Sequence, residues 1–155
     1  MTIDLKGILA ERDVKTAVPA RCQRDVLTKL AGHAAQSFDL DEREVFEALM
    51  ERERLGSTGI GRGVAIPHAK ADVPSVRGVL FQLCRPVDFE AVDDRPVDLA
   101  FLLLAPEGDD AGHLKALSRV ARRLRGEGTQ RALRGARSAE ALYAVVSGEG
   151  AAEAA

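Results

Sequence analysis

The feature that most constrains the fold is a nearly continuous apolar run, VDLAFLLLA, from Val97 to Ala105. Proline bounds the run on both sides, at Pro96 and Pro106. The run is far shorter than the roughly 20 residues that a membrane-spanning helix needs. A short apolar run of this kind is typical of a β-strand that is buried on both faces. We therefore expect a sheet that is covered by helices on both sides.

The segments around this run carry the periodicity of helices. Apolar residues recur at helical spacing over residues 24–36 and again over residues 45–50. Asp41 with Glu44 resembles the capping box that opens a helix, and Gly56 is well placed to end it. The remaining predicted elements are a strand over residues 76–84 and helices over residues 111–124, 129–134 and 139–146.

Together these patterns predict an α/β fold in one domain, residues 1–147, followed by a flexible tail, residues 148–155. The sheet is expected to be mixed, with about five strands and helices on both faces. The tail is predicted from its Gly, Ala and Glu composition, which leaves little to bury.

The composition limits the classes of function. Aromatic residues make up 4% of the chain and Trp is absent, so stacking platforms for single-stranded nucleic acid are not expected. Cys22 and Cys84 form no CxxC pair, and we expect free thiols in a reducing compartment, the cytoplasm. The histidines and cysteines lack the spacing of zinc ligands, so we expect neither a metal nor another cofactor.

The stretch GSTGIGRGVAIPHAK, from Gly56 to Lys70, concentrates four glycines ahead of Pro67 and His68. Such a stretch can cradle a phosphate with backbone N–H groups, or it can simply connect a helix to a strand. It matches neither the P-loop nor the dinucleotide-binding pattern. Proline fixes the backbone beside His68, whose imidazole is a usable nucleophile at neutral pH. The alternative is an ordinary loop histidine that bonds a backbone carbonyl.

The run LGSTGIGRGVAIPHAK, Leu55 to Lys70, resembles the signature of the fructose/mannitol-type enzyme IIA domain of the bacterial phosphoenolpyruvate-dependent phosphotransferase system (PTS). The preceding EALMERERLGSTG and the later segments FEAVDDRPVDLAFLLLAP and HLKALSRVARRL agree in the same order. The likeness covers almost the whole chain. It is greatest to the nitrogen-regulatory IIA proteins, which stand alone.

This resemblance implies the roles of three residues. His68 accepts a phosphoryl group from a small phosphocarrier protein of the HPr or NPr type. His113 is the second active-site histidine, and Arg52, which lies 16 residues before His68, belongs to the same pocket. Four residues of the glycine-rich stretch are further candidates for binding phosphate: Ser57, Thr58, Gly59 and Gly61.

Physical arguments support these roles, but each residue has a plainer interpretation. Phosphoryl transfer needs positioning and compensation of charge, which a guanidinium such as that of Arg52 supplies. Yet Arg52 lies in the charged run ERER, where solvated side chains are common, and Arg54 is a second candidate. His113 is expected near the start of a helix, whose positive end favours a neutral imidazole. No motif reaches His33, which we interpret as structural or exposed.

The main hypothesis is therefore a regulatory phosphocarrier, a phosphotransferase component of the nitrogen-type PTS. One alternative is a sugar-uptake IIA protein that passes phosphate to a IIB domain, and another is an interaction module that works without phosphorylation. The segment from Lys115 to Arg137 has eight basic residues and one acid. We expect a solvated helix face there, formed by Lys115, Arg119, Arg122 and Arg123, with docking of an acidic partner or of nucleic acid as alternatives. Arg62 either helps to hold the anion or points to solvent.

Overall fold

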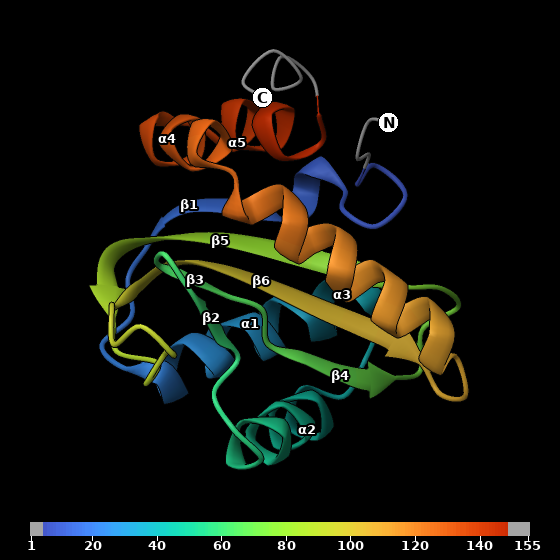
Figure 1. Cartoon of the computed structure of the whole chain (residues 1–155). Helices are drawn as coiled ribbons and strands as arrows, with labels where there is room; N and C mark the ends of the chain where they lie inside the picture. Colours follow the sequence, from blue (N-terminus) through green and yellow to red (C-terminus); the bar gives the residue numbers. More distant parts are fainter. Residues whose placement is uncertain (1–4, 149–155) are drawn as a thin grey trace.

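The computed structural model describes residues 5–148, and its sheet is built around the predicted buried strand (Figure 1). That strand is β6, Val97–Pro106, which pairs antiparallel with β5, Arg77–Val87. On the far side of β5 lies β1, Val14–Val18, in parallel. The predicted mixed sheet is confirmed. Its main path runs in the order β1-β5-β6-β3-β2, and β4 makes a sixth strand.

The other edge of β6 carries the short strands that the glycine-rich stretch forms. β3, Val64–Ala65, and β4, His68–Ala71, pair parallel with successive parts of β6. β2, Gly59–Gly61, pairs antiparallel with β3 and forms a small hairpin with it. β4 is an edge strand, so side chains at its start lie at the rim of the sheet.

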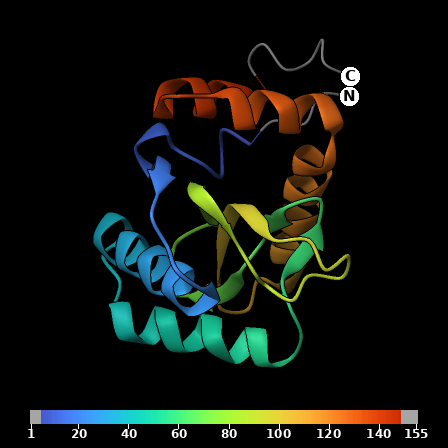
Figure 2. The same ribbon diagram turned by 90° about the vertical axis from the view of Figure 1, so that its left-hand side faces the viewer.

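The helices form two groups on opposite sides of the sheet, as Figures 1 and 2 show. One side carries α1, Gln23–Phe38, and α2, Glu42–Arg54. The other carries α3, Asp110–Arg125, α4, Glu127–Gly135, and α5, Ala139–Val146. A short 3-10 helix, Glu11–Asp13, precedes β1. The predicted helices are all present, with boundaries that differ by a few residues.

β6 is apolar from Leu99 to Ala105 because each of its faces meets a different core. Ala100, Leu102 and Leu104 pack with α1 and α2, whereas Leu99, Phe101 and Leu103 pack with α3, α4 and α5. Successive side chains of a strand point to opposite faces, so neither face leaves room for a polar residue between Leu99 and Ala105. The prediction of a strand buried on both sides is confirmed.

The signals at the ends of α2 are confirmed as well. The Asp41 side chain accepts a hydrogen bond from the Glu44 backbone N–H at 3.0 Å and caps the helix. The helix ends at Arg54, and Gly56 follows with a φ of +144°. The predicted tail falls almost entirely on residues 149–155, which lie outside the described residues. In the described part of the chain, no helix is long and apolar enough to cross a membrane.

Candidate active site

His68 opens the edge strand β4, directly after the Ile66-Pro67 step that links it to β3. The Leu103 N–H of β6 donates to the Pro67 carbonyl at 2.9 Å and fixes this step against the sheet. Ala69 and Ala71 pack against the core beneath α1 and α2. Because strand side chains alternate, His68 and Lys70 face the other side, toward α3.

The two nitrogens of the His68 ring have different partners. Nδ1 lies 2.9 Å from the Ile66 carbonyl oxygen, and Nε2 lies 3.0 Å from Nε of Arg52. A carbonyl oxygen only accepts and a guanidinium only donates. The ring therefore carries its proton on Nδ1 and presents the lone pair of Nε2. Burial, together with the positive charge of Arg52, lowers the pKa of His68 below its ordinary value, against the opposing effect of the Ile66 carbonyl.

Arg52 reaches His68 from the last turn of α2. Its Nη1 also donates to the Gly56 carbonyl at 2.8 Å, so the guanidinium spans the end of the helix and the ring. Arg54, the second candidate in the same charged run, instead pairs with Glu51 at 2.8 Å on the exposed surface. Of the two arginines, the structure therefore brings Arg52 to the histidine.

His113 approaches His68 from the first turn of α3. The two ring centroids are 5.2 Å apart, and the rings meet edge to face. Within residues 5–148, Nε2 of His113 is buried and has no hydrogen-bond partner. Burial lowers the pKa of His113, and the nearby His68 and Lys70 lower it further, although Asp110 and Asp109 act in the opposite direction. The neutral state expected at a helix start is thus favoured mainly by burial.

The hydroxyl groups predicted to bind phosphate are occupied by hydrogen bonds to other groups of the protein. The Ser57 hydroxyl donates to the Phe89 carbonyl and accepts from the Gly59 N–H at 3.0 Å. The Thr58 hydroxyl and N–H both donate to the carboxylate of Glu53. Burial raises the pKa of Glu53, an effect that its hydrogen bonds with Thr58 oppose. In this conformation, Thr58 fastens the loop to the end of α2, and Ser57 fastens it to the segment that precedes β6.

Two glycines of the stretch are explained by packing and backbone angle. A Cβ on Gly59 would lie 2.7 Å from the Cβ of Ala91, which is closer than side chains approach. Gly61 has a φ of +98°, a conformation that favours glycine. Both residues allow the β2–β3 hairpin to fit against the segment that precedes β6.

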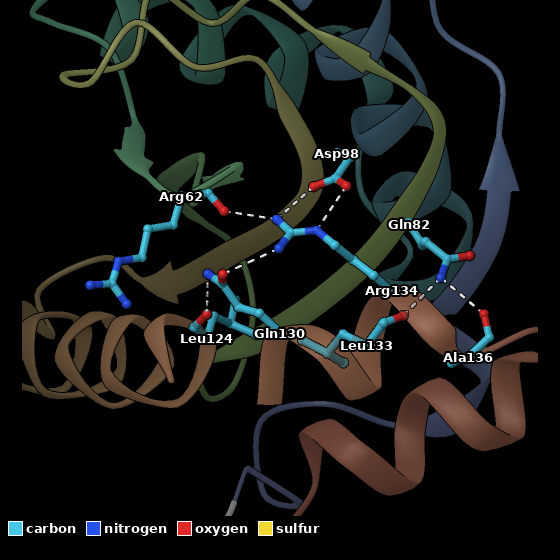
Figure 3. A network of polar contacts seen from close by, with 8 residues as sticks. All are labelled: Arg62, Gln82, Asp98, Leu124, Gln130, Leu133, Arg134 and Ala136. Carbon is cyan, nitrogen blue, oxygen red and sulfur yellow. Dashed lines mark hydrogen bonds and ion pairs between the residues drawn. The ribbon is translucent and has the colours of Figure 1, made fainter. Parts of the chain in front are cut away.

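Arg62 does not face the histidines. Its Nη1 donates to the Arg125 carbonyl at 3.2 Å at the end of α3. Its own carbonyl accepts from Arg134, whose guanidinium also forms a two-pronged ion pair with Asp98 at 2.9 Å (Figure 3). Figure 3 shows the Arg62 side chain extending away from Arg134. Arg62 and its neighbours therefore fasten the hairpin to α3 and α4.

The basic segment is only partly the solvated face that the sequence predicts. Lys115, Arg119 and Arg122 are exposed on α3. Arg123, which was expected on the same face, is half-buried and donates to the Val145 carbonyl at 2.8 Å. The prediction of a solvated side chain is therefore wrong for Arg123, because its guanidinium hydrogen-bonds to the backbone of α5.

Sequence reasoning missed two charged residues beside the histidines. Lys70 and Asp110 form an ion pair at 2.5 Å that joins β4 to the start of α3. The signal in the sequence was weak: Lys70 lies two residues after His68, on the same side of a strand. Among the described residues, no group of three or more His, Cys, Asp or Glu could hold a metal ion.

These observations define the class of site: a histidine whose unprotonated Nε2 faces a guanidinium, with a second histidine beside it, at the rim of a mixed α/β sheet. Residues 7–148 match the family model described as "Phosphoenolpyruvate-dependent sugar phosphotransferase system, EIIA 2". The chain belongs to this EIIA type-2 family of the PTS.

Relatives and solved structures agree with this assignment. The chain is 45% identical over 144 residues to a nitrogen regulatory protein of Bradyrhizobium diazoefficiens, covering 92% of this chain and 94% of the relative. It is 40% identical over 148 residues to a nitrogen regulatory protein of Escherichia coli, covering 94% and 91%. The crystal structure of nitrogen regulatory protein IIA-Ntr from Neisseria meningitidis superposes with a TM-score of 0.86 at 32% identity, covering 92% of this chain and 98% of the other.

Proposed function

We propose that this protein is a regulatory phosphocarrier whose His68 accepts a phosphoryl group from a phosphorylated carrier protein of the HPr or NPr type. One observation carries the proposal: Nε2 of His68 presents its lone pair to a guanidinium at 3.0 Å, while Nδ1 is held by a carbonyl at 2.9 Å. A neutral ring with one unprotonated, oriented nitrogen is what nucleophilic attack on phosphorus requires. Such a donor would place the reaction in the cytoplasm.

In the proposed step, Nε2 of His68 attacks the phosphorus of the donor's phosphohistidine. The Nε2–P bond forms as the donor's N–P bond breaks, and the electron pair of the broken bond stays on the donor's imidazole. The proton stays on Nδ1 of His68 throughout and is donated in a hydrogen bond to the Ile66 carbonyl oxygen. Arg52 turns from the nitrogen to the phosphoryl oxygens, where a fixed positive charge stabilises the transition state.

His113 is proposed to hold the phosphoryl group from the other side. Its buried Nε2 has no partner within residues 5–148, and a buried polar atom without a hydrogen bond is costly. A phosphoryl oxygen on His68 would accept a hydrogen bond from this nitrogen, because the two rings are already in contact. Ser57, Thr58, Gly59 and Gly61 would bind phosphate only after leaving their present roles in the loop.

The regulatory role is favoured because the relatives described above are named nitrogen regulatory proteins. Regulatory target proteins would then read the phosphorylation state of His68. The second candidate, phosphate transfer to a IIB domain for sugar uptake, is favoured by the family's description as part of a sugar phosphotransferase system. Growth on fructose or mannitol after deletion of the gene separates the two, since only the uptake role predicts a growth defect.

The direct test is transfer of labelled phosphate. The protein is incubated with enzyme I, an HPr-type carrier and labelled phosphoenolpyruvate, and protein-bound label is followed over time. We expect label on the wild type and on His33→Gln, and none on His68→Gln. Label that persists in His68→Gln, or a wild type that takes none, overturns the proposal. In the latter case the interaction module becomes the better explanation.

A further inference from the structure

We infer that Lys70 is a second cationic ligand of the phosphoryl group on His68. Before phosphorylation, Lys70 forms an ion pair with Asp110 instead. The inference rests on the proposed function and adds a residue to its site. Lys70 lies two residues after His68 on β4, so the two side chains leave the strand on the same face. Their Cα atoms are about 6.6 Å apart by the rise of a strand, a distance that a lysine side chain can span.

The contacts of β4 with its neighbours show that the Lys70 side chain points toward α3, as His68 does. Ala69 and Ala71, which alternate with His68 and Lys70, pack into the core beneath α1 and α2. Lys70 instead contacts α3, where its Nζ lies 2.5 Å from Oδ1 of Asp110. His68 also contacts α3, through the ring of His113. The ion pair and the two rings therefore bridge the same two elements.

Asp110 and His113 are also close to each other in the helix. Asp110 is the first residue of α3, and residues three apart share one face of a helix. Lys70 lowers the pKa of His113 and Asp110 raises it, so both charges act on the second histidine. The ammonium group of Lys70 thus already lies within the electrostatic range of the proposed phosphoryl site.

The charge balance explains why a second cation is needed. A phosphoryl group brings close to two negative charges at neutral pH, whereas Arg52 supplies one positive charge at Nε2 of His68. The Lys70 side chain is only 25% exposed, and that of Asp110 is 92% exposed. When Lys70 turns to the phosphoryl group, the Asp110 carboxylate is left in water, where an ion pair contributes little stability. The exchange of partners is therefore favourable.

A simpler role for the pair would be to tether α3 to β4, and two variants distinguish the roles. Each variant also removes a charge near His68, so a tether alone predicts small shifts of opposite sign and similar size in the pKa of the phosphoryl group for Lys70→Met and Asp110→Asn. If Lys70 is a phosphoryl ligand, Lys70→Met removes a directly bound cation, whereas Asp110→Asn removes only an exposed carboxylate that Lys70 has already left. The shift in Lys70→Met must then be clearly larger than the shift in Asp110→Asn.

The test uses full-length protein that is phosphorylated on His68 with phosphoramidate, a small chemical donor, and followed by ³¹P NMR as a function of pH. A nearby cation lowers the pKa of the phosphoryl group, by about one unit at close range. We expect Lys70→Met to raise the titration midpoint by about that amount, Asp110→Asn to lower it by clearly less, and Lys70→Arg to keep it near the wild-type value. Lys15→Met, the same change on strand β1 at the far edge of the sheet, should have no effect.

The outcomes separate this inference from the proposed function. Midpoint shifts of similar size in Lys70→Met and Asp110→Asn, or no shift in Lys70→Met, overturn the ligand role. Failure of phosphoramidate to modify His68 overturns it too, since there is then no phosphoryl group to hold. A wild type that phosphoramidate labels but that takes no label from the protein donor contradicts only the proposed function.

Discussion

Two histidine rings in this molecule lie in polar networks of opposite charge. The mostly buried ring of His33, on α1, points Nε2 at the carboxylate of Asp13 at 2.9 Å. His68, on β4, points its Nε2 at the guanidinium of Arg52 at 3.0 Å. Both rings also contact another ring, Phe81 in the first case and His113 in the second. The chemical difference therefore comes from the charge of the partner.

A carboxylate and a guanidinium use an imidazole in different ways. Asp13 is buried, and it accepts hydrogen bonds from both His33 and the Ser37 hydroxyl, at 2.9 and 2.5 Å. A carboxylate only accepts, so Nε2 of His33 is engaged as a donor and its lone pair is not available. Arg52 only donates, so Nε2 of His68 keeps its lone pair toward the site. The first arrangement joins a 3-10 helix to α1, and the second prepares a nucleophile.

The largest effect on the labelling rate is expected when Arg52 is replaced by an acidic residue, so that His68 faces a carboxylate as His33 does. Arg52→Glu places a carboxylate beside His68, which repels the phosphoryl group and removes its stabilising cation. Loss of one such donor lowers a rate by about 10²–10³-fold, so Arg52→Gln should fall in that range and Arg52→Glu below it. The initial rate of labelling from the phosphorylated carrier measures this. Arg54→Glu, two residues away in the same charged run, should remain close to the wild type.

The fold could be predicted where the sequence pattern is local. The apolar run of β6 and the periodicity of the helices each report burial within one element, and both are confirmed. Strands β1, β2 and β4 were missed because each has five residues or fewer, which is too short for a clear periodicity. Their pairing with β5 and β6 depends on contacts that are remote in the sequence.

The candidate site also has a part that could be predicted from the sequence and a part that depends on remote contacts. Arg52, His68 and His113 were named from motif spacing, and the structure brings their side chains together. Their chemical roles stay predictions. The partners of Ser57 and Thr58 could not be predicted, since one is the distant Phe89 carbonyl and the other is Glu53 across the end of a helix. Only the packing of α3 beside β4 reveals the Lys70–Asp110 pair.

An intermediate effect is expected in the network of Asp13, His33 and Ser37. There, a substitution should change the stability of the fold and leave phosphoryl transfer to His68 unchanged. Asp13→Ala leaves Nε2 of His33 and the Ser37 hydroxyl without their common acceptor. Loss of a buried hydrogen-bond partner costs about 1–3 kcal/mol, so the free energy of unfolding in urea should fall by that amount. The rate of labelling of His68 should be unchanged in the folded protein. Asp72→Ala, at an exposed position, serves as the control for stability.

If Asp13→Ala is fully folded but its rate of labelling falls, the networks around His33 and His68 are coupled through the sheet. A stability equal to that of the wild type would mean that the His33 ring and Ser37 find water in place of the carboxylate. Either result would remove the contrast between a structural and a functional histidine.

The smallest effect concerns the titration of His68. Its pKa is lowered by burial first and by Arg52 in addition, so the ring should titrate below pH 6.5, the ordinary value for histidine. The folded protein then binds fewer protons than the unfolded chain just below that pH, and its stability falls as the pH drops through the lowered pKa. Arg52→Gln removes one cause and leaves burial, so the midpoint should rise yet stay below 6.5. Proton NMR of the His68 ring measures the midpoint, with Arg54→Gln as the matched control. A midpoint that does not move in Arg52→Gln would show that burial alone keeps the nucleophile neutral, and that Arg52 serves the phosphoryl group only.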